Sequence, residues 1–205
     1  MGQILQDNDQ VLRRGPEISG TRLVLLHGWG ADADDLLDLA DLLVGPQVSV
    51  VALRAPMVHP SGLGRQWYSL QPIDWDELPT ARHSLRSRLI ELGSSVPLDR
   101  TVLLGFSQGG AMAMDVGGEL PLAGIVACSG YPHQGWAPAL QTHRPPVLLS
   151  HGRQDPVVPY AASEALLEQL HQAGREARLL PFSGGHTIDA TVLPEIASFV
   201  RTCLA

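Results

Sequence analysis

The order of elements along this sequence predicts an α/β fold, with a mostly parallel central sheet and helices on both faces. Short runs rich in Leu and Val alternate with longer segments whose apolar residues have helical spacing. A mostly parallel sheet that is covered on both faces requires this alternation. The 205 residues are enough for one well-buried core and too few for two, so we expect a single domain over residues 1–205.

The first half of the chain supplies two predicted strands and a long excursion. The apolar run Arg22–Leu26 is the first strand. A helix is predicted over Ala31–Val44, because its apolar residues share one face and its first turn holds several Asp residues, which the helix dipole favours. Val48–Leu53 is the next strand. Residues 54–78 contain Pro, Gly and Trp without a clear period, and a long excursion of this kind tends to be functional.

The second half continues the alternation. Leucines at i, i+4 and i+7 predict a helix over Thr80–Leu92, which Gly93 ends. Strand Thr101–Phe106 and the small-residue helix Gln108–Gly118 follow directly on each other around Ser107. The remaining predicted elements, in order, are strands Ala123–Cys128 and Val147–Ser150, helix Pro159–Ala173, strand Glu176–Pro181 and helix Ile188–Cys203.

Charge and cysteine content exclude several classes of protein. The net charge is −7 and the basic residues are scattered, so no nucleic-acid partner is expected. Cys128 and Cys203 form neither a disulfide framework nor a metal-ligand spacing, and Cys128 is expected in the core. Residues 1–10 lack the pattern of a secretory signal, and no apolar run is long enough to span a membrane. We therefore expect a cytoplasmic protein without a stable membrane anchor or a metal.

The pentapeptide around Ser107 carries the chemistry. Gly105-Phe106-Ser107-Gln108-Gly109 fits the pattern G-x-S-x-G, which alone is a weak signal. Its position between a predicted strand and a predicted helix makes it specific, because a serine on that sharp turn projects its hydroxyl beyond the sheet edge. The sequence therefore predicts that Ser107 is a nucleophile. The alternative, a serine that only caps the helix, is less favoured.

A nucleophilic serine needs a base, and the base needs an orienting carboxylate. Asp155 and His186 each follow a predicted strand and come in the order expected for this arrangement, Ser, acid, His. The sequence assigns them those roles. The weaker rivals are Asp99, Asp115 and Asp189 among the acids and His133, His143 and His171 among the bases, and these histidines are expected to be solvated.

An oxyanion intermediate needs two convergent backbone amides. One is expected from Gln108, which follows the nucleophile, and the other from Trp29, which lies in the glycine-containing loop after the first predicted strand. His27 is then structural, and its side chain is expected to bond nearby backbone. A dinucleotide site of the form G-x-G-x-x-G fails, because Asp34 stands where the third glycine is needed.

Four motifs, LHGWGA, GFSQGGAM, HGRQDPVVPY and GGHT, occur in one order from about residue 22 to the carboxyl terminus. With them the chain resembles the small carboxylesterase, lysophospholipase and acyl-protein thioesterase group of α/β-hydrolases. The resemblance implies an α/β-hydrolase fold without a large cap domain. It also implies Ser107, Asp155 and His186 as a catalytic triad, Trp29 and Gln108 as oxyanion donors, and hydrolysis without a cofactor.

The expected activity is that of a serine carboxylesterase, which hydrolyses short- to medium-chain acyl esters through an acyl-enzyme intermediate. Residues 54–78 are expected near the active site, and Met57, Leu63, Trp67 and Val157 are expected to contact the substrate. The alternatives are an acyl-protein thioesterase or lysophospholipase, and more remotely a non-catalytic ligand-binding protein of the same fold. The expected partner is a small acyl ester or thioester, and a homodimer is left open.

Overall fold

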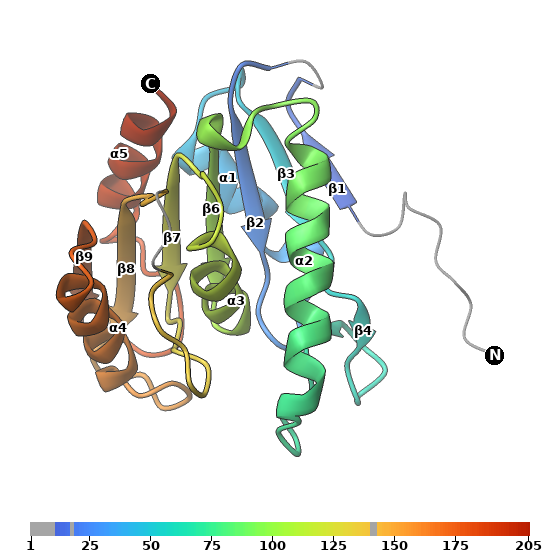
Figure 1. The fold of residues 1–205 in the computed structure, drawn as a ribbon, viewed down its shortest axis with the longest axis vertical. Coiled ribbons are helices and arrows are strands. Elements are labelled where there is room, and N and C mark those ends of the chain that lie inside the picture. Colours follow the sequence, from blue (N-terminus) through green and yellow to red (C-terminus); the bar gives the residue numbers. More distant parts are fainter. Residues whose placement is uncertain (1–10, 17–18, 140–142) are drawn as a thin grey trace.

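The computed structural model describes residues 11–16, 19–139 and 143–205. A seven-stranded sheet forms its centre, in the order β1-β3-β2-β6-β7-β8-β9 (Figure 1). Strand β1 pairs antiparallel with β3, and every other neighbouring pair is parallel. The strands are β1 Val11–Arg14, β2 Arg22–Leu26, β3 Ser49–Leu53, β6 Thr101–Phe106, β7 Gly124–Cys128, β8 Val147–Gly152 and β9 Ala177–Phe182.

Helices cover both faces of this sheet. On one face lie α2, α3 and α4, and on the other lie α1 and α5 (Figure 1). Successive residues of the central strands point to opposite faces, so that Val24 packs in one core and Leu23 and Leu25 in the other. The helices are α1 Leu37–Leu43, α2 Leu78–Leu92, α3 Gln108–Gly117, α4 Ala161–Gln172 and α5 Leu193–Leu204.

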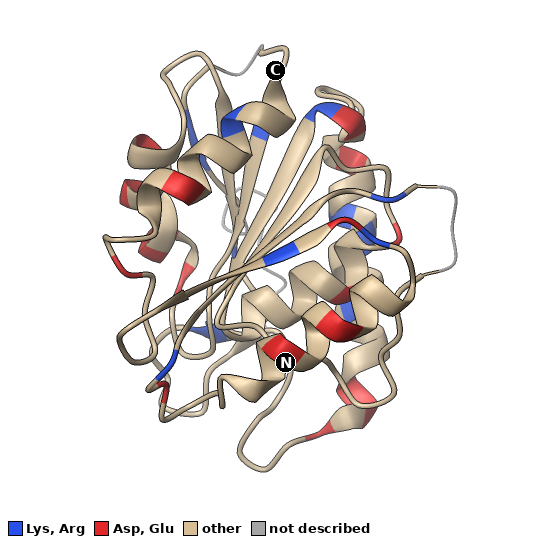
Figure 2. Cartoon of the chain, turned by 90° about the vertical axis from the view of Figure 1, so that its left-hand side faces the viewer, with Lys and Arg blue, Asp and Glu red and all other residues tan. Residues whose placement is uncertain are grey.

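The predicted fold class and most of the predicted elements are confirmed. Strands β2 and β6 have the predicted bounds, and Cys128 is buried as expected. The expectation that the chain lacks a secretory signal concerns residues 1–10, which lie outside the described residues. No described helix is both long and apolar enough to cross a membrane. Lys and Arg residues are spread over several elements (Figure 2).

Three predicted helices begin later than their patterns suggested: α4 begins at Ala161 rather than Pro159, and the other two are delayed by local turns. The segment predicted as one helix over 31–44 divides into a 3-10 turn, η2 Ala33–Leu36, and α1, because the Asp32 side chain accepts from Ala33 N and starts the tighter turn. The last helix, α5, begins at Leu193 rather than Ile188. Before it, Asp189 Oδ1 accepts from both the N and the Oγ1 of Thr191, which makes a turn of that segment.

The excursion over residues 54–78 contains two short strands, β4 Met57–Val58 and β5 Arg65–Gln66, and a 3-10 turn, η3 Trp75–Glu77. The strands pair antiparallel outside the main sheet. A further 3-10 turn, η4 Leu98–Arg100, leads into β6. The sequence predicted neither β4 nor β5, and in the main sheet it missed β1, a half-buried edge strand without an apolar run.

Candidate active site

Ser107 lies on a sharp turn between β6 and α3, at the carboxyl edge of the sheet. Its backbone has φ 54° and ψ −118°, a strained conformation for a residue with a side chain. The turn is held by a hydrogen bond from Ser107 N to Cys128 O, 2.8 Å. A Cβ on Gly105 would overlap the carbonyl of Gly109, and one on Gly109 would overlap that of Leu26, so this turn requires both glycines.

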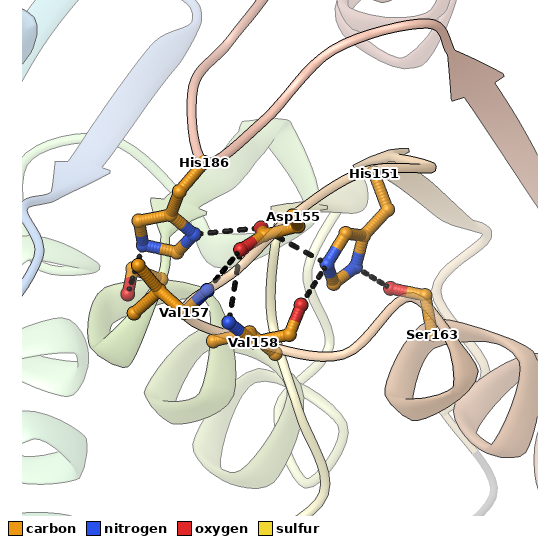
Figure 3. A network of polar contacts seen from close by, with 7 residues as sticks. His151, Asp155, Val157, Val158, Ser163 and His186 are labelled. Atoms are coloured by element: carbon orange, nitrogen blue, oxygen red, sulfur yellow. Dashed lines mark hydrogen bonds and ion pairs between the residues drawn. The ribbon is translucent and has the colours of Figure 1, made fainter.

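The structure brings Ser107, His186 and Asp155 together. The Oγ of Ser107 lies 2.9 Å from Nε2 of His186, and Nδ1 of the same ring lies 2.7 Å from Oδ2 of Asp155. Figure 3 shows the imidazole of His186 beside the Asp155 carboxylate. Three residues far apart in the sequence therefore form one hydrogen-bonded chain.

The loops after β8 and β9 position the acid and the base. Gln154 N donates to Gly184 O and Arg153 N donates to Phe182 O, both at 2.9 Å, which ties one loop to the other. A Cβ on Gly152 would overlap the carbonyl of Gly184, so glycine is needed where the two loops cross. The relative position of His186 and Asp155 is thus fixed by backbone contacts as well as by their own hydrogen bond.

Backbone amides hold the Asp155 carboxylate. Oδ1 accepts from Val157 N at 2.8 Å and from Val158 N at 2.9 Å, and the side chain is fully buried. Burial by itself raises the pKa of the Asp155 carboxyl, but the hydrogen bonds from His186, Val158 and Val157 outweigh burial and lower the pKa below its usual value. The group therefore stays ionised, which is the state that stabilises an imidazolium.

The loop after β2 lies against the turn at Ser107. A Cβ on Gly28 would lie 3.4 Å from Ser107 Cβ, so Trp29 is near the serine. Within the described residues, neither Trp29 N nor Gln108 N donates a hydrogen bond to another group. Both amides are therefore without an acceptor in the described part of the chain.

A sequence profile described as phospholipase/carboxylesterase matches residues 15–204, which is most of the chain. The chain belongs to this family. Its sheet order and covering helices are those of the α/β-hydrolase fold, without a large cap domain. Members of the phospholipase/carboxylesterase family that resemble the chain include esterases and acyl-protein thioesterases, and membership supports a hydrolase activity.

Three similar proteins illustrate this range. Acyl-protein thioesterase 1 of Neurospora crassa is 34% identical over 54% of this chain and 49% of its own length, so the chain spans about half of that relative. Esterase YpfH of Escherichia coli is 28% identical over 89% of this chain and 83% of its own length. The crystal structure of esterase PE8 superposes with a TM-score of 0.82 at 33% identity, covering 95% of this chain and 97% of that one.

His27 is structural, as predicted. It is buried, its Nδ1 bonds Gly28 O at 2.8 Å, and its Nε2 accepts from Ala55 N at 3.0 Å. Burial lowers the pKa of His27, against the opposing effects of the Gly28 bond and of the nearby carboxylates, so the neutral ring can accept from Ala55. The histidine of LHGWGA therefore supports the loop through hydrogen bonds to the backbone.

The four residues expected to contact the substrate lie in different environments. Leu63 and Val157 are 78% and 64% exposed, and Met57 is half-buried. Trp67 is only 1% exposed and donates from Nε1 to His27 O at 3.0 Å, so the expectation that it faces the substrate is corrected: it belongs to the core. The periodless sequence around Trp67 concealed this burial.

An open groove of about 270 Å³ lies on the His186 side of the site. Its walls come from the η2–α1 segment, from the residue before Ser107 and from the loop that carries His186. The centroids of the Phe106 and His186 rings lie 4.8 Å apart. The lining residues are Asp35, Leu36, Leu39, Phe106, His186, Thr187 and Ile188. The sequence did not predict this groove.

Two histidines differ from what the sequence suggested. His133, expected to be solvated, is 4% exposed and bonds Asp115 Oδ2 through Nδ1 at 2.6 Å, because its Pro- and Gln-containing loop folds back over α3. His151 received no role, yet it is fully buried beside Asp155, with its Nε2 3.2 Å from Oδ2 (Figure 3). Its position at the end of a buried strand, four residues before Asp155, is the signal that could have revealed it.

Proposed function

We propose that the protein is a serine carboxylesterase that hydrolyses short- to medium-chain acyl esters through an acyl-enzyme intermediate. Ser107 is the nucleophile, His186 the general base and Asp155 the group that orients the base. The observation that carries this proposal is the hydrogen-bonded chain from Ser107 Oγ through both nitrogens of His186 to Asp155. The described domain, with its 54–78 excursion beside the site, is proposed to act without a cofactor.

The reaction has two halves. Neutral His186 takes the Ser107 proton through Nε2 while Oγ attacks the acyl carbon, and ionised Asp155 stabilises the imidazolium. The amides of Trp29 and Gln108 bind the tetrahedral oxyanion, and loss of one such donor typically lowers kcat by about 10²–10³. The imidazolium then protonates the departing alcohol, and water deacylates Ser107 by the same path.

The groove beside His186 is the proposed place of the leaving group. His186 must give its proton to the departing oxygen, so the alcohol has to leave on that side of the serine. The groove is lined mainly by apolar side chains, including Leu36, Leu39 and Ile188. The acyl chain then lies toward the exposed Leu63 and Val157.

Acyl-protein thioesterase activity is the second candidate, because several relatives carry that name. The same serine chemistry hydrolyses both esters and thioesters, and a lysophospholipase activity would use it as well. The acyl group and the size of the leaving group distinguish these activities.

The test compares p-nitrophenyl esters of increasing acyl length with matched acyl-cysteine peptides, for the wild type and for Ser107→Ala. We expect the highest kcat/KM for a short- or medium-chain ester, and a loss of turnover of at least about 10³-fold in the variant. Higher kcat/KM for the long-chain acyl-cysteine peptide would favour the thioesterase. Equal turnover of all substrates by Ser107→Ala would overturn the serine mechanism.

A further inference from the structure

The excursion over residues 54–78 meets the site through three consecutive buried residues. Gln66, Trp67 and Tyr68 are 3%, 1% and 0% exposed. Most of their neighbours in the excursion are exposed or half-buried. Their polar groups bond to the loop after β2, to Gln108 at the start of α3, and to Tyr131 and His133 beside that helix. The tripeptide is therefore placed between the loop that carries Trp29 and the start of α3, which carries Gln108.

The first set of contacts reaches the loop after β2. Gln66 Oε1 accepts from the indole Nε1 of Trp29 at 2.8 Å, and the indole of Trp67 donates to His27 O at 3.0 Å. Just before the tripeptide, Arg65 O accepts from Gly30 N at 2.8 Å. The segment thus holds the backbone on both sides of Trp29 and also its side chain.

The second set reaches the residue after Ser107. The Gln108 side chain is fully buried, its Oε1 accepts from Trp67 N at 3.0 Å, and its Nε2 donates to Tyr68 O at 2.8 Å. An amide side chain bonded at both ends in this way has one orientation. The Gln108 backbone at the start of α3 is therefore tied directly to the backbone of the tripeptide.

The far end of the tripeptide is anchored on the same helix. The Tyr68 hydroxyl lies 2.6 Å from the Tyr131 hydroxyl and 2.9 Å from His133 Nε2, and His133 Nδ1 lies 2.6 Å from Asp115 Oδ2 on α3. Burial, with the neighbouring Tyr131, raises the pKa of the Tyr68 phenol, so the hydroxyl stays protonated. The contacts close a ring that runs from α3 through the tripeptide and back to α3.

We propose that Gln66, Trp67 and Tyr68 are positioning residues that set the spacing between the oxyanion-binding amides of Trp29 and Gln108. We call this tripeptide the oxyanion clamp. The inference rests on the proposed function. One amide comes from the loop after β2 and the other from the start of α3, and donors stabilise a transition state best when they are held in place before reaction. The clamp bonds to both segments, so it fixes that geometry.

The test removes single contacts and leaves both amides present. Gln66→Met keeps the side-chain shape but removes the acceptor, and Trp29→Phe removes the indole donor but keeps the backbone N–H. We expect either change to lower kcat about 10–100-fold while KM stays within about twofold, because the loss is confined to the transition state. Inhibition by an aryl trifluoromethyl ketone, which forms a tetrahedral adduct, should weaken by a similar factor. The matched control is Val58→Ala, an exposed side chain of the same excursion, which should behave like the wild type.

The double variant separates a clamp from a general loss of structure. If the indole–amide contact is what matters, Gln66→Met combined with Trp29→Phe should be no slower than the slower single variant. Effects on kcat that multiply, or a rise in KM at unchanged kcat, would overturn the proposal. If Gln66→Met does not fold, as judged by circular dichroism, Trp29→Phe alone decides by the same criteria. No Ser107-dependent turnover in the wild type would instead refute the proposed function, and normal turnover by both single variants would refute only the clamp.

Discussion

His151 Nε2 lies 3.2 Å from Asp155 Oδ2, the oxygen that also lies 2.7 Å from His186 Nδ1. The carboxylate therefore lies between two imidazoles (Figure 3). His151 Nε2 also lies 2.9 Å from Val158 O, which can only accept, so Nε2 carries the hydrogen. Its Nδ1 lies 2.7 Å from Ser163 Oγ on α4. His151 thus links the loop that presents Asp155 to the helix behind it.

The first prediction concerns this link. Changing His151→Leu leaves Val158 O and Ser163 Oγ buried without their partner, so the free energy of unfolding should fall by about 1–3 kcal/mol. Urea denaturation measures the change. Ser163→Ala removes only one of the partners of His151, so its free energy of unfolding should fall by less. An unchanged unfolding midpoint in His151→Leu would show that the link does not stabilise the loop.

The second prediction concerns the orienting carboxylate. In Asp155→Asn the amide offers an N–H toward His186 Nδ1, which favours the tautomer whose Nε2 cannot accept the Ser107 proton. We expect kcat to fall by roughly 10⁴-fold with little change in KM, as expected for loss of this role. Steady-state kinetics on a p-nitrophenyl ester measure both constants. A kcat within tenfold of the wild type would remove Asp155 from the mechanism.

The third prediction follows from the lowered pKa of Asp155. In the unfolded chain this carboxyl has a pKa of about 3.9, so in acid the unfolded state binds more protons than the folded state. Its contribution to stability is complete above that value and is lost as the pH falls toward the folded-state pKa. The difference in unfolding free energy between the wild type and Asp155→Asn should be smaller at about pH 3.5 than at about pH 5.5. If this difference in unfolding free energy stayed constant or grew as the pH fell, the pKa of Asp155 would not be lowered in the folded protein.

The sequence was sufficient for the elements whose signal is local. Strand β6 is a continuous apolar run that ends at the turn, and the turn itself requires glycine at 105 and 109 for steric reasons that the pentapeptide pattern encodes. The expectation that Asp155 and His186 lie near Ser107 followed from their places after successive strands, because the carboxyl ends of parallel strands share one edge.

Features that depend on how loops fold back could not be predicted in this way. His133 reads as a surface histidine because its loop contains Pro and Gln, and only the contacts with α3 and Tyr68 bury it. The sequence places Trp67 in the 54–78 excursion, which has no clear period and therefore suggests a pocket residue. Only the contact with His27 O shows that the side chain is buried. The start of α5 depends on the local turn at Asp189, whose hydrogen bonds compete with the helix.

The fourth prediction concerns the thiols. Burial raises the pKa of Cys128 to about 12, and burial together with the Glu176 carboxylate raises that of Cys203 to about 11. The thiolate is the reactive form, so both cysteines should be nearly inert at about pH 8 in the folded protein. Ellman's reagent should detect almost no thiol before denaturation and both thiols after it. Rapid labelling of the native protein with loss of esterase activity would contradict this.

The most direct test of the account is the covalent capture of the nucleophile by a fluorophosphonate, followed by intact-mass and peptide mass spectrometry. The hydrogen-bonded chain from Ser107 through His186 to Asp155 predicts a single adduct per chain, located on Ser107. Ser107→Ala should acquire no adduct, and His186→Ala should react far more slowly. A wild-type protein that remains unmodified under conditions that label other serine esterases, or an adduct on another residue, would contradict the central claim.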